Sequence, residues 1–142
     1  MDLNNRYIRQ IILPGFGIAT QEKLGTAKVL IVGMGGLGCP VLQYLVGVGV
    51  GTIGIMDADK ISKSNLHRQL LYDEKEVGRL KVEVAANKAK AQNSSVDIVE
   101  YPFTLSKNNA AEILELGFDV TFFHVFDPFS NKEDKFGVVF LF

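Results

Sequence analysis

The residues with the clearest chemical potential in this 142-residue sequence are four glycines near its start. They are Gly33, Gly35, Gly36 and Gly38. Three of them have the spacing G-x-G-x-x-G, which follows an apolar run at 28–32 and precedes an apolar helical pattern at 39–46. In a strand–loop–helix unit, the first glycine allows a tight turn, the second lets a phosphate approach the backbone, and the third lets helix and strand pack closely. Because the helix start also offers unpaired N–H groups, the sequence predicts a nucleotide site here.

Two carboxylates follow the next apolar run. Residues 52–56 are predicted to form a second strand, and Asp57 comes directly after it, with Asp59 two positions later. The segment 28–57 has about the length of one βαβ crossover. An acidic residue at the end of the second strand is where such a unit binds a ribose hydroxyl. A turn carboxylate without a ligand is the alternative for both aspartates.

A polar segment further along contains side chains suited to phosphate binding. Asn65, Arg68 and Gln69 lie within residues 64–69, and the planar guanidinium of Arg68 matches phosphate oxygens. The apolar spacing predicts a helix over 76–92, with Lys81 near its start. A lysine at the positive end of a helix dipole indicates an anion nearby, and an ordinary solvated lysine is the alternative.

The rest of the chain predicts further strands and helices in alternation. We expect helices at 4–13 and 19–25, a strand at 96–101, a helix at 106–116 capped by Ser106, and a strand at 118–126. This alternation predicts an α/β fold with a Rossmann-like, doubly wound parallel sheet.

Composition excludes several classes of protein. Fifteen basic and sixteen acidic residues leave a formal charge of −1, so nothing indicates a nucleic-acid or membrane surface. Cys39 is the single cysteine, which excludes an intrachain disulfide, and we expect it to be a buried packing residue. The first ten residues are polar and no apolar run has the length of a membrane span, so we expect a cytoplasmic protein.

The order of the motifs resembles one family more specifically than any single motif does. The motifs are Arg6-Tyr7-x-Arg9-Gln10, the glycine loop, Asp57-x-Asp59, Ser64-Asn65-Leu66-x-Arg68-Gln69 and Gly78-x-x-Lys81. They occur in the order seen in the ThiF/MoeB/HesA family of ATP-dependent activators of ubiquitin-like and sulfur-carrier proteins. The resemblance covers residues 4 to about 120 and is strongest to the eukaryotic enzymes that serve molybdopterin synthesis and tRNA thiolation.

The resemblance implies a reaction and a set of cofactors. The family joins ATP to the C-terminal glycine carboxylate of a small β-grasp protein, giving an acyl-adenylate and pyrophosphate, with Mg²⁺ as the companion ion. The glycine loop would lie under the nucleotide, and Asp57 would hold the ribose. Asn65, Arg68 and Lys81 would meet the triphosphate and its Mg²⁺.

The resemblance also extends to further residues and to partners. Asp59 and Gln69 complete the expected cofactor-binding set, and no residue is predicted as a direct metal ligand. The family works as a homodimer in which Arg9 would reach the phosphates of the neighbouring subunit. Arg9, Arg68 and Lys81 are therefore the expected catalytic residues, and a small ubiquitin-like or sulfur-carrier protein is the expected partner.

The sequence departs from the family after its fourth predicted strand. The family carries Asp-x-x-Asp-Asn there, and the second acid helps to hold Mg²⁺. Asp119 matches the first position, but Asp127 is one position late and precedes Pro128. We therefore expect an N-terminal helical arm at 1–27, an incomplete ATP-binding domain at 28–126 and an atypical tail at 127–142. A chain truncated in this way is expected to be inactive alone.

Two other functions fit part of the pattern. An NAD-binding oxidoreductase domain shares the glycine fingerprint and Asp57, but it has no need of Arg68 and Lys81 directed at phosphates. A non-catalytic fragment that pairs with an intact homologue through the helix of Arg9 is the other alternative. A P-loop is excluded because Cys39 and a proline follow Gly38 in place of Lys-Ser/Thr.

Overall fold

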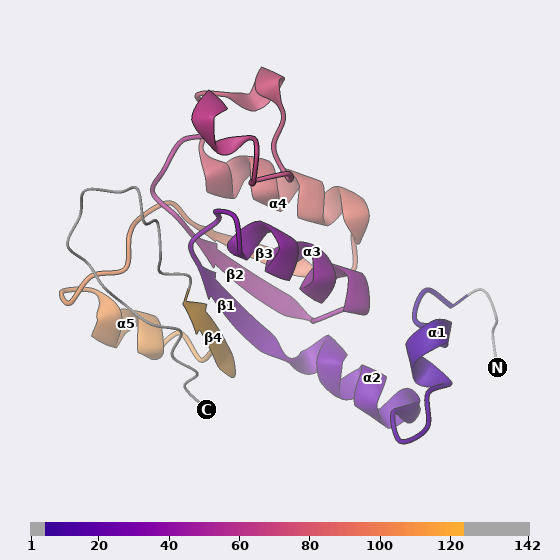
Figure 1. The fold of residues 1–142 in the computed structure, drawn as a ribbon. Helices are drawn as coiled ribbons and strands as arrows, with labels where there is room; N and C mark the ends of the chain where they lie inside the picture. Colours follow the sequence, from indigo (N-terminus) through magenta and orange to yellow (C-terminus); the bar gives the residue numbers. More distant parts are fainter. Residues whose placement is uncertain (1–4, 124–142) are drawn as a thin grey trace.

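A four-stranded parallel sheet forms the centre of the protein (Figure 1), for which the computed structural model describes residues 5–123. The strands are β1 (Lys28–Val32), β2 (Thr52–Met56), β3 (Asp97–Tyr101) and β4 (Val120–Phe123). Their order is β3-β2-β1-β4, and all neighbours are parallel. The order reverses between β1 and β4, and sheets of this kind bind ligands at the carboxyl ends of the strands beside that reversal.

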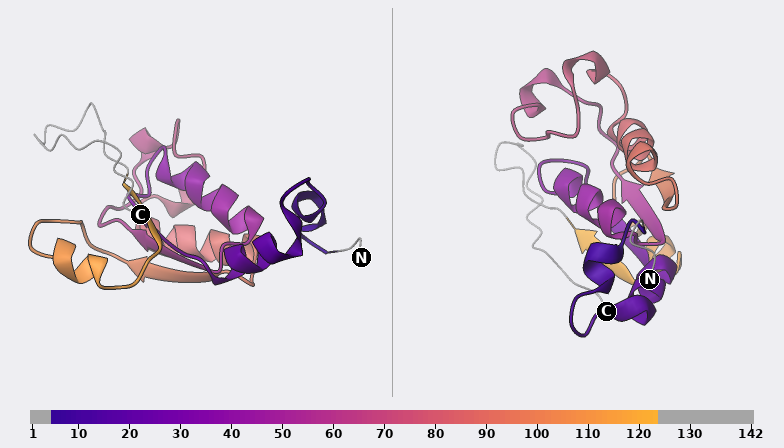
Figure 2. Two further views of the ribbon diagram at one scale, coloured as in Figure 1. Left: turned by 90° about the horizontal axis from the view of Figure 1, so that it is seen from below. Right: turned by 90° about the vertical axis from the view of Figure 1, so that its right-hand side faces the viewer.

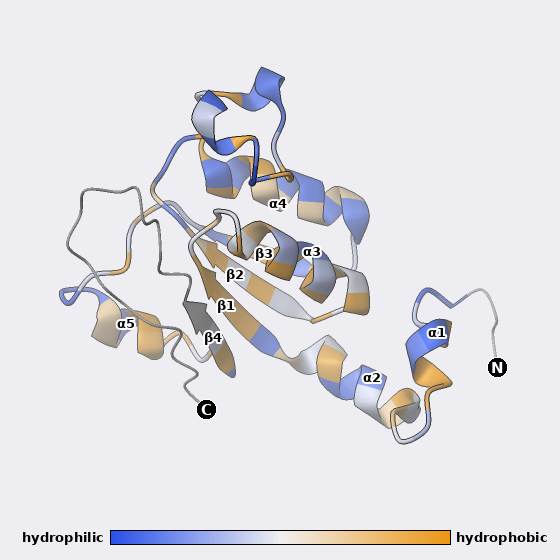
Figure 3. Cartoon of the chain, in the orientation of Figure 1, coloured by the Kyte–Doolittle hydropathy of each residue, from blue (hydrophilic) through white to orange (hydrophobic). Residues whose placement is uncertain are grey.

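Helices follow the strands and cover both faces of the sheet. They are α3 (Gly38–Val48) after β1, α4 (Lys81–Gln92) after β2 and α5 (Ala110–Leu114) after β3. Val29 and Ile31 of β1 belong to the large apolar cluster shared with α3 and α4, whereas Leu30 packs with Ile113 of α5 on the opposite face. Figure 3 shows the resulting apolar colouring along β1 and β2. Strands buried on both faces explain the continuous apolar runs, and the predicted α/β class is confirmed.

A helical arm precedes β1. It consists of α1 (Ile8–Ile11) and α2 (Gly17–Thr26), so the first helix is shorter than the predicted 4–13 and the second is longer than 19–25. Figures 1 and 2 place both helices at the end of the sheet opposite to the carboxyl ends of the strands.

The predicted helix over 76–92 was wrong at its start. Residues Glu74–Glu76 form a separate 3₁₀ turn, which the Asp73 side chain caps. Gly78 then has φ +91°, in the left-handed region that a continuous helix cannot contain. The backbone N–H of Lys81 donates to the Asp59 carbonyl (3.0 Å), so α4 begins against the segment that follows β2.

Other predicted boundaries also need correction. Ser106 does not cap α5, because that helix begins after Asn109, and the Asn109 side chain instead accepts a hydrogen bond from the Ser106 N–H (2.7 Å). The third strand begins at Asp97 rather than at residue 96, and the fourth begins at Val120 rather than at 118. The predicted end of that strand at 126, Asp127 and the tail at 127–142 lie outside the described residues.

Candidate nucleotide site

The glycine loop connects β1 to α3 at the carboxyl edge of the sheet. Gly33 has φ +95°, and its N–H donates to the Met56 carbonyl at the end of β2 (2.7 Å). A Cβ atom at Gly38 would lie 1.8 Å from the Gly33 carbonyl oxygen, so α3 starts too close to β1 for any side chain at this position. These two glycines therefore have the backbone roles that the spacing predicts.

The peptide groups on either side of Met34 are held by three side chains. The Met34 N–H donates to Asp57 Oδ2 (2.7 Å), and its carbonyl accepts from the Tyr72 hydroxyl (2.9 Å) and from Cys39 Sγ (3.5 Å). Burial raises the pKa of the Cys39 thiol to about 11 and raises the pKa of Tyr72 far above its usual value, so both remain neutral donors. Hydrogen bonds from within the chain therefore hold the glycine loop in its conformation.

Asp57 lies where the sequence predicts it, directly after β2. Its Oδ1 accepts from the Asp59 N–H (2.7 Å), while its Oδ2 accepts from Met34. Each carboxylate oxygen has a second lone pair, so Asp57 can still accept a hydrogen bond from a ribose hydroxyl.

The Asp57-x-Asp59 and Gly78-x-x-Lys81 motifs lie side by side as paired backbone. Residues 60 and 80 form an antiparallel bridge, and the Ile61 N–H donates to the Arg79 carbonyl while the Ile61 carbonyl accepts from the Gly78 N–H (2.9 Å each). The left-handed turn at Gly78 allows this pairing. Two motifs separated by about 20 residues therefore form one unit at the edge of the glycine loop.

Lys81 is the first residue of α4 and is buried. Its ammonium group lies 3.2 Å from Asp59 Oδ2, and the side chains of Lys81 and Asp59 are 6% and 74% exposed. An ammonium carries three donors, and within the described residues Asp59 is its one recorded partner. A buried cation at a helix N-terminus is a costly arrangement unless anions surround it.

Hydrogen bonds hold the polar segment that follows Asp59 in a defined conformation. The Asn65 carbonyl accepts from the backbone N–H groups of both Arg68 (3.1 Å) and Gln69 (3.0 Å), and the Asn65 side chain accepts from Ser62 (3.0 Å). Lys88 of α4 fixes the end of the segment by donating to the carbonyl of Leu71 (2.6 Å). Sequence reasoning missed both Lys88 and Tyr72, since neither belongs to a motif.

Arg68 and Gln69 differ in where their side chains lie. The stem of Arg68 lies against the glycine loop, because a Cβ atom at Gly36 would be 3.5 Å from Arg68 Cγ. Gln69 is 3% exposed, and its Oε1 has no hydrogen-bond partner within the described residues. Such an unpaired buried oxygen costs about 1–3 kcal/mol, which a bound group with a donor would remove.

These residues fit a nucleotide with its Mg²⁺. Lys81 and Arg68 carry cationic donors of the kind that bind phosphate oxygens, and the unpaired Gln69 Oε1 is free to accept a hydrogen bond. Residues 5–123 contain no group of three or more His, Cys, Asp or Glu side chains that could hold a metal ion alone.

The arm attaches to the opposite end of the domain. Arg6 donates to the Gln92 carbonyl (3.1 Å), and Gln10 donates to the Val48 carbonyl (2.9 Å), so both residues satisfy helix C-termini. The ring of Tyr7 lies against Gly49, where a Cβ atom would come within 2.5 Å of it. Three residues of the Arg6–Gln10 motif thus act within their own chain.

Arg9 does not reach the nucleotide site of its own chain. It is exposed, and among residues 5–123 no hydrogen bond or ion pair of its guanidinium is recorded. The arm contacts the C-terminal end of α3, whereas the glycine loop lies at the N-terminal end of this 11-residue helix. The rise of an α-helix separates those ends by about 16 Å.

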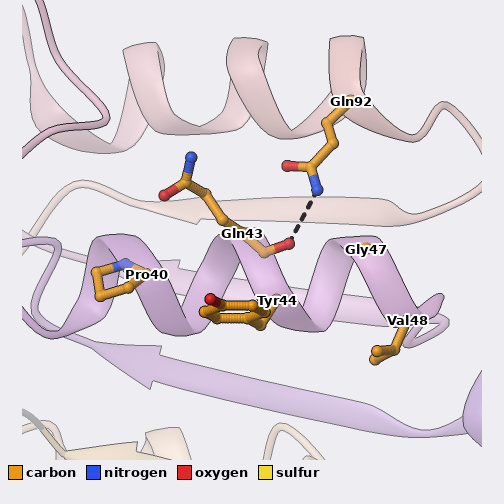
Figure 4. Close-up of a pocket in the computed structure, with 6 residues that line it drawn as sticks. All are labelled: Pro40, Gln43, Tyr44, Gly47, Val48 and Gln92. Atoms are coloured by element: carbon orange, nitrogen blue, oxygen red, sulfur yellow. Dashed lines mark hydrogen bonds between the residues drawn. The ribbon is translucent and has the colours of Figure 1, made fainter.

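A shallow concavity of about 450 Å³ lies on the outer surface of α3 (Figure 4). It is lined by Pro40, Gln43, Tyr44, Gly47, Val48 and Gln92. None of these is a predicted site residue, and the concavity therefore stands apart from the nucleotide site.

Within residues 5–123, no helix combines the length and apolar character needed to cross a bilayer.

The order of the five motifs, and the convergence of four of them on one edge of the sheet, agree with the comparison to known proteins. The sequence pattern of the ThiF family matches residues 7–133. The chain belongs to the ThiF family. Among its relatives, the adenylyltransferase and sulfurtransferase UBA4 of Meyerozyma guilliermondii is 52% identical over 111 residues, which are 78% of this chain and 26% of that protein. The sulfur carrier protein adenylyltransferase of Thermus thermophilus is 50% identical over 110 residues, which are 78% of this chain and 41% of that protein.

Solved structures of related proteins agree with the ThiF assignment. Escherichia coli MccB, solved with MccA-N7isoASN, has a TM-score of 0.64 and 35% identity, covering 66% of this chain and 27% of that chain. The E. coli tRNA N6-threonylcarbamoyladenosine dehydratase TcdA, solved with ATP, has a TM-score of 0.75 at 24% identity, covering 78% and 45%, and shows the shared fold. The predicted resemblance is confirmed, and this ThiF chain spans less than half the length of the two relatives named above.

Proposed function

We propose that this ThiF chain binds ATP with Mg²⁺ and forms the nucleotide-binding part of an enzyme that adenylates the C-terminal glycine of a small sulfur-carrier or ubiquitin-like protein. The observation that carries the proposal is the buried Lys81 ammonium, which lies at the start of α4 and has one carboxylate partner, Asp59, within the described residues. An NAD site would need no buried cation at this position. The names of the two relatives support the same reaction class.

Each residue of the site has a proposed role. The glycine loop and the start of α3 lie under the phosphates, and Asp57 accepts from the ribose. Arg68, Asn65 and Lys81 would act on the triphosphate, and the unpaired Gln69 Oε1 would accept a hydrogen bond from the bound group. Mg²⁺ supplies positive charge to the phosphate oxygens.

The reaction explains why so much positive charge is gathered. The carrier carboxylate attacks the α-phosphate, and pyrophosphate leaves with the electron pair of the broken P–O bond. Two anions therefore approach each other before the bond forms. Arg68 and Lys81 offset this repulsion, and fixed positioning supplies much of the remaining rate.

Arg9 has a proposed role that requires a second copy of the chain. Its own nucleotide site is at the far end of α3, so only the Arg9 of a neighbouring subunit can approach the phosphates. We place the resulting homodimer in the cytoplasm, in agreement with a chain whose single cysteine precludes an internal disulfide.

Calorimetric titration with ATP·Mg²⁺ and with NAD tests the proposal. We expect ATP to bind more tightly, and Lys81→Met or Arg68→Ala to weaken ATP by about 10- to 100-fold, because each removes a charge-assisted contact to phosphate. Lys90→Met is the matched control, since Lys90 is an exposed lysine of the same helix. Tighter binding of NAD, or unchanged ATP affinity in both site variants, would refute the proposal.

A further inference from the structure

Asp59 and Lys81 form a pair whose two members differ sharply in exposure. The lysine is buried, with 6% of its side chain exposed, whereas the carboxylate is 74% exposed. We propose that Asp59 is a temporary counter-ion, which neutralises Lys81 while the site is free of nucleotide and is displaced when phosphate oxygens bind the ammonium. This inference rests on the proposed ATP site and gives Asp59 a role distinct from that of Asp57.

The hydrogen bonds of the two aspartates support that distinction. Both oxygens of Asp57 accept from backbone N–H groups, those of Met34 and Asp59 (2.7 Å each), so its carboxylate is fixed. Among residues 5–123, the Asp59 carboxylate has one hydrogen-bond partner, Lys81, at 3.2 Å. Its backbone, in contrast, is anchored, since the Asp59 carbonyl accepts from the Lys81 N–H (3.0 Å). The side chain can therefore turn into solvent without disturbing the start of α4.

The electrostatics of the site favour the displacement of the Asp59 carboxylate from Lys81 by phosphate. A buried ammonium without an anion is costly, so the nucleotide-free protein needs a counter-ion at this position. Polyphosphate carries more negative charge than one carboxylate and offers several acceptors to the donors that Lys81 has left. A carboxylate that stayed against Lys81 would repel the incoming phosphates. Because the Asp59 carboxylate is already largely exposed, it gives up only a weak ion-pair attraction when it moves into solvent.

The proposal makes Asp59 a competitor of phosphate and not a ligand of ribose. We would measure the dissociation constants of ATP, pyrophosphate and adenosine for the full 142-residue chain and for Asp59→Asn. Loss of the competing carboxylate should tighten ATP and pyrophosphate by about twofold to fivefold, the range expected for one largely exposed ion pair. Adenosine, which has no phosphate, should bind unchanged.

The pair Asp59→Asn and Lys81→Met provides the matched control. In the Lys81→Met background the gain from Asp59→Asn should disappear, because no ammonium remains for which carboxylate and phosphate compete. Asp59→Ser is a second neutral variant, and thermal unfolding without nucleotide checks that each protein is folded.

Each of the remaining outcomes would overturn either the displacement of Asp59 or the proposed function. Equal weakening of adenosine and ATP in Asp59→Asn would identify Asp59 as a ribose ligand and overturn the exchange. Unchanged ATP affinity in a folded Asp59→Asn protein would overturn it and leave the ATP site standing. Failure of both neutral variants to fold would also overturn it, since a counter-ion that the fold always requires cannot be released. Absence of ATP and pyrophosphate binding to the folded parent would refute the proposed function itself.

Discussion

Replacing Gly38 by alanine should destabilise the protein at the junction of β1 and α3. The added Cβ would lie 1.8 Å from the Gly33 carbonyl oxygen and 2.9 Å from its carbon, while real Cβ contacts are essentially never closer than 3.0 Å. The backbone of Gly33 cannot yield easily, because its N–H is bonded to Met56 at 2.7 Å. The clash therefore involves two backbone segments and not the end of a flexible side chain.

Two opposing effects determine the size of the change. Alanine favours a helix over glycine by about 1 kcal/mol, and Gly38 is the first residue of α3. Overpacking that forces the backbone to shift costs about 1–3 kcal/mol and occasionally more. A required movement of roughly 1.2 Å belongs at the upper end of that range. We therefore expect a net loss of about 2 kcal/mol in the free energy of unfolding, or about 6–10 °C in Tm.

Urea and thermal unfolding followed by circular dichroism measure this loss, and two other glycines provide controls. Gly25→Ala lies within α2, where a Cβ would have nothing within 4 Å, so it should stabilise the protein by about 0.5–1 kcal/mol. Gly36→Ala brings its Cβ only to ordinary contact with Arg68, at 3.5 Å, and should change stability by less than about 0.5 kcal/mol. A Gly38→Ala protein as stable as Gly36→Ala would refute the reasoning.

Two further predictions concern the side chains behind the glycine loop. Tyr72→Phe removes the hydroxyl that donates to the Met34 carbonyl at 2.9 Å, and it should cost about 0.5–1.5 kcal/mol in urea unfolding and weaken ATP binding; a protein with unchanged stability would contradict this. Burial raises the pKa of the Cys39 thiol from 9.0 to about 11, so its contribution to stability is complete below pH 9 and is lost as the pH rises toward 11. At pH 8 a disulfide reagent should label Cys39 only slowly until urea unfolds the chain, and rapid labelling of the folded protein would show that the thiol is not protected.

The glycine loop and the sheet were predictable because their signals are local. A strand buried on both faces needs a continuous apolar run, and a tight turn into a helix needs glycine at fixed spacing. The position of Asp57 directly after β2 follows from the same pattern. These features depend on residues that are neighbours in the sequence, and the structure confirms them.

The contacts that complete the candidate site join residues far apart in the chain. Tyr72 reaches Met34 across 38 positions, Asp57 reaches Met34 across 23, and Lys81 reaches Asp59 across 22. No periodicity specifies such pairs. The error at the start of α4 has the same origin, because the apolar spacing continues through Gly78 while the backbone there turns away to pair with Ile61.

The Arg6–Gln10 motif attaches the N-terminal arm to the domain through three of its residues. Arg6, Tyr7 and Gln10 hold the arm to the C-terminal ends of α3 and α4, which leaves Arg9 exposed at the end of the domain farthest from the glycine loop. A homodimer that uses Arg9 must therefore bring this end of one subunit to the glycine loop of the other. A two-fold axis across the outer surface of α3 would do so for both sites at once, since two antiparallel copies of α3 would place each C-terminal end beside the partner's N-terminal end. The concavity around the highly exposed Tyr44 lies on that same surface of α3 and would be covered in such an arrangement (Figure 4).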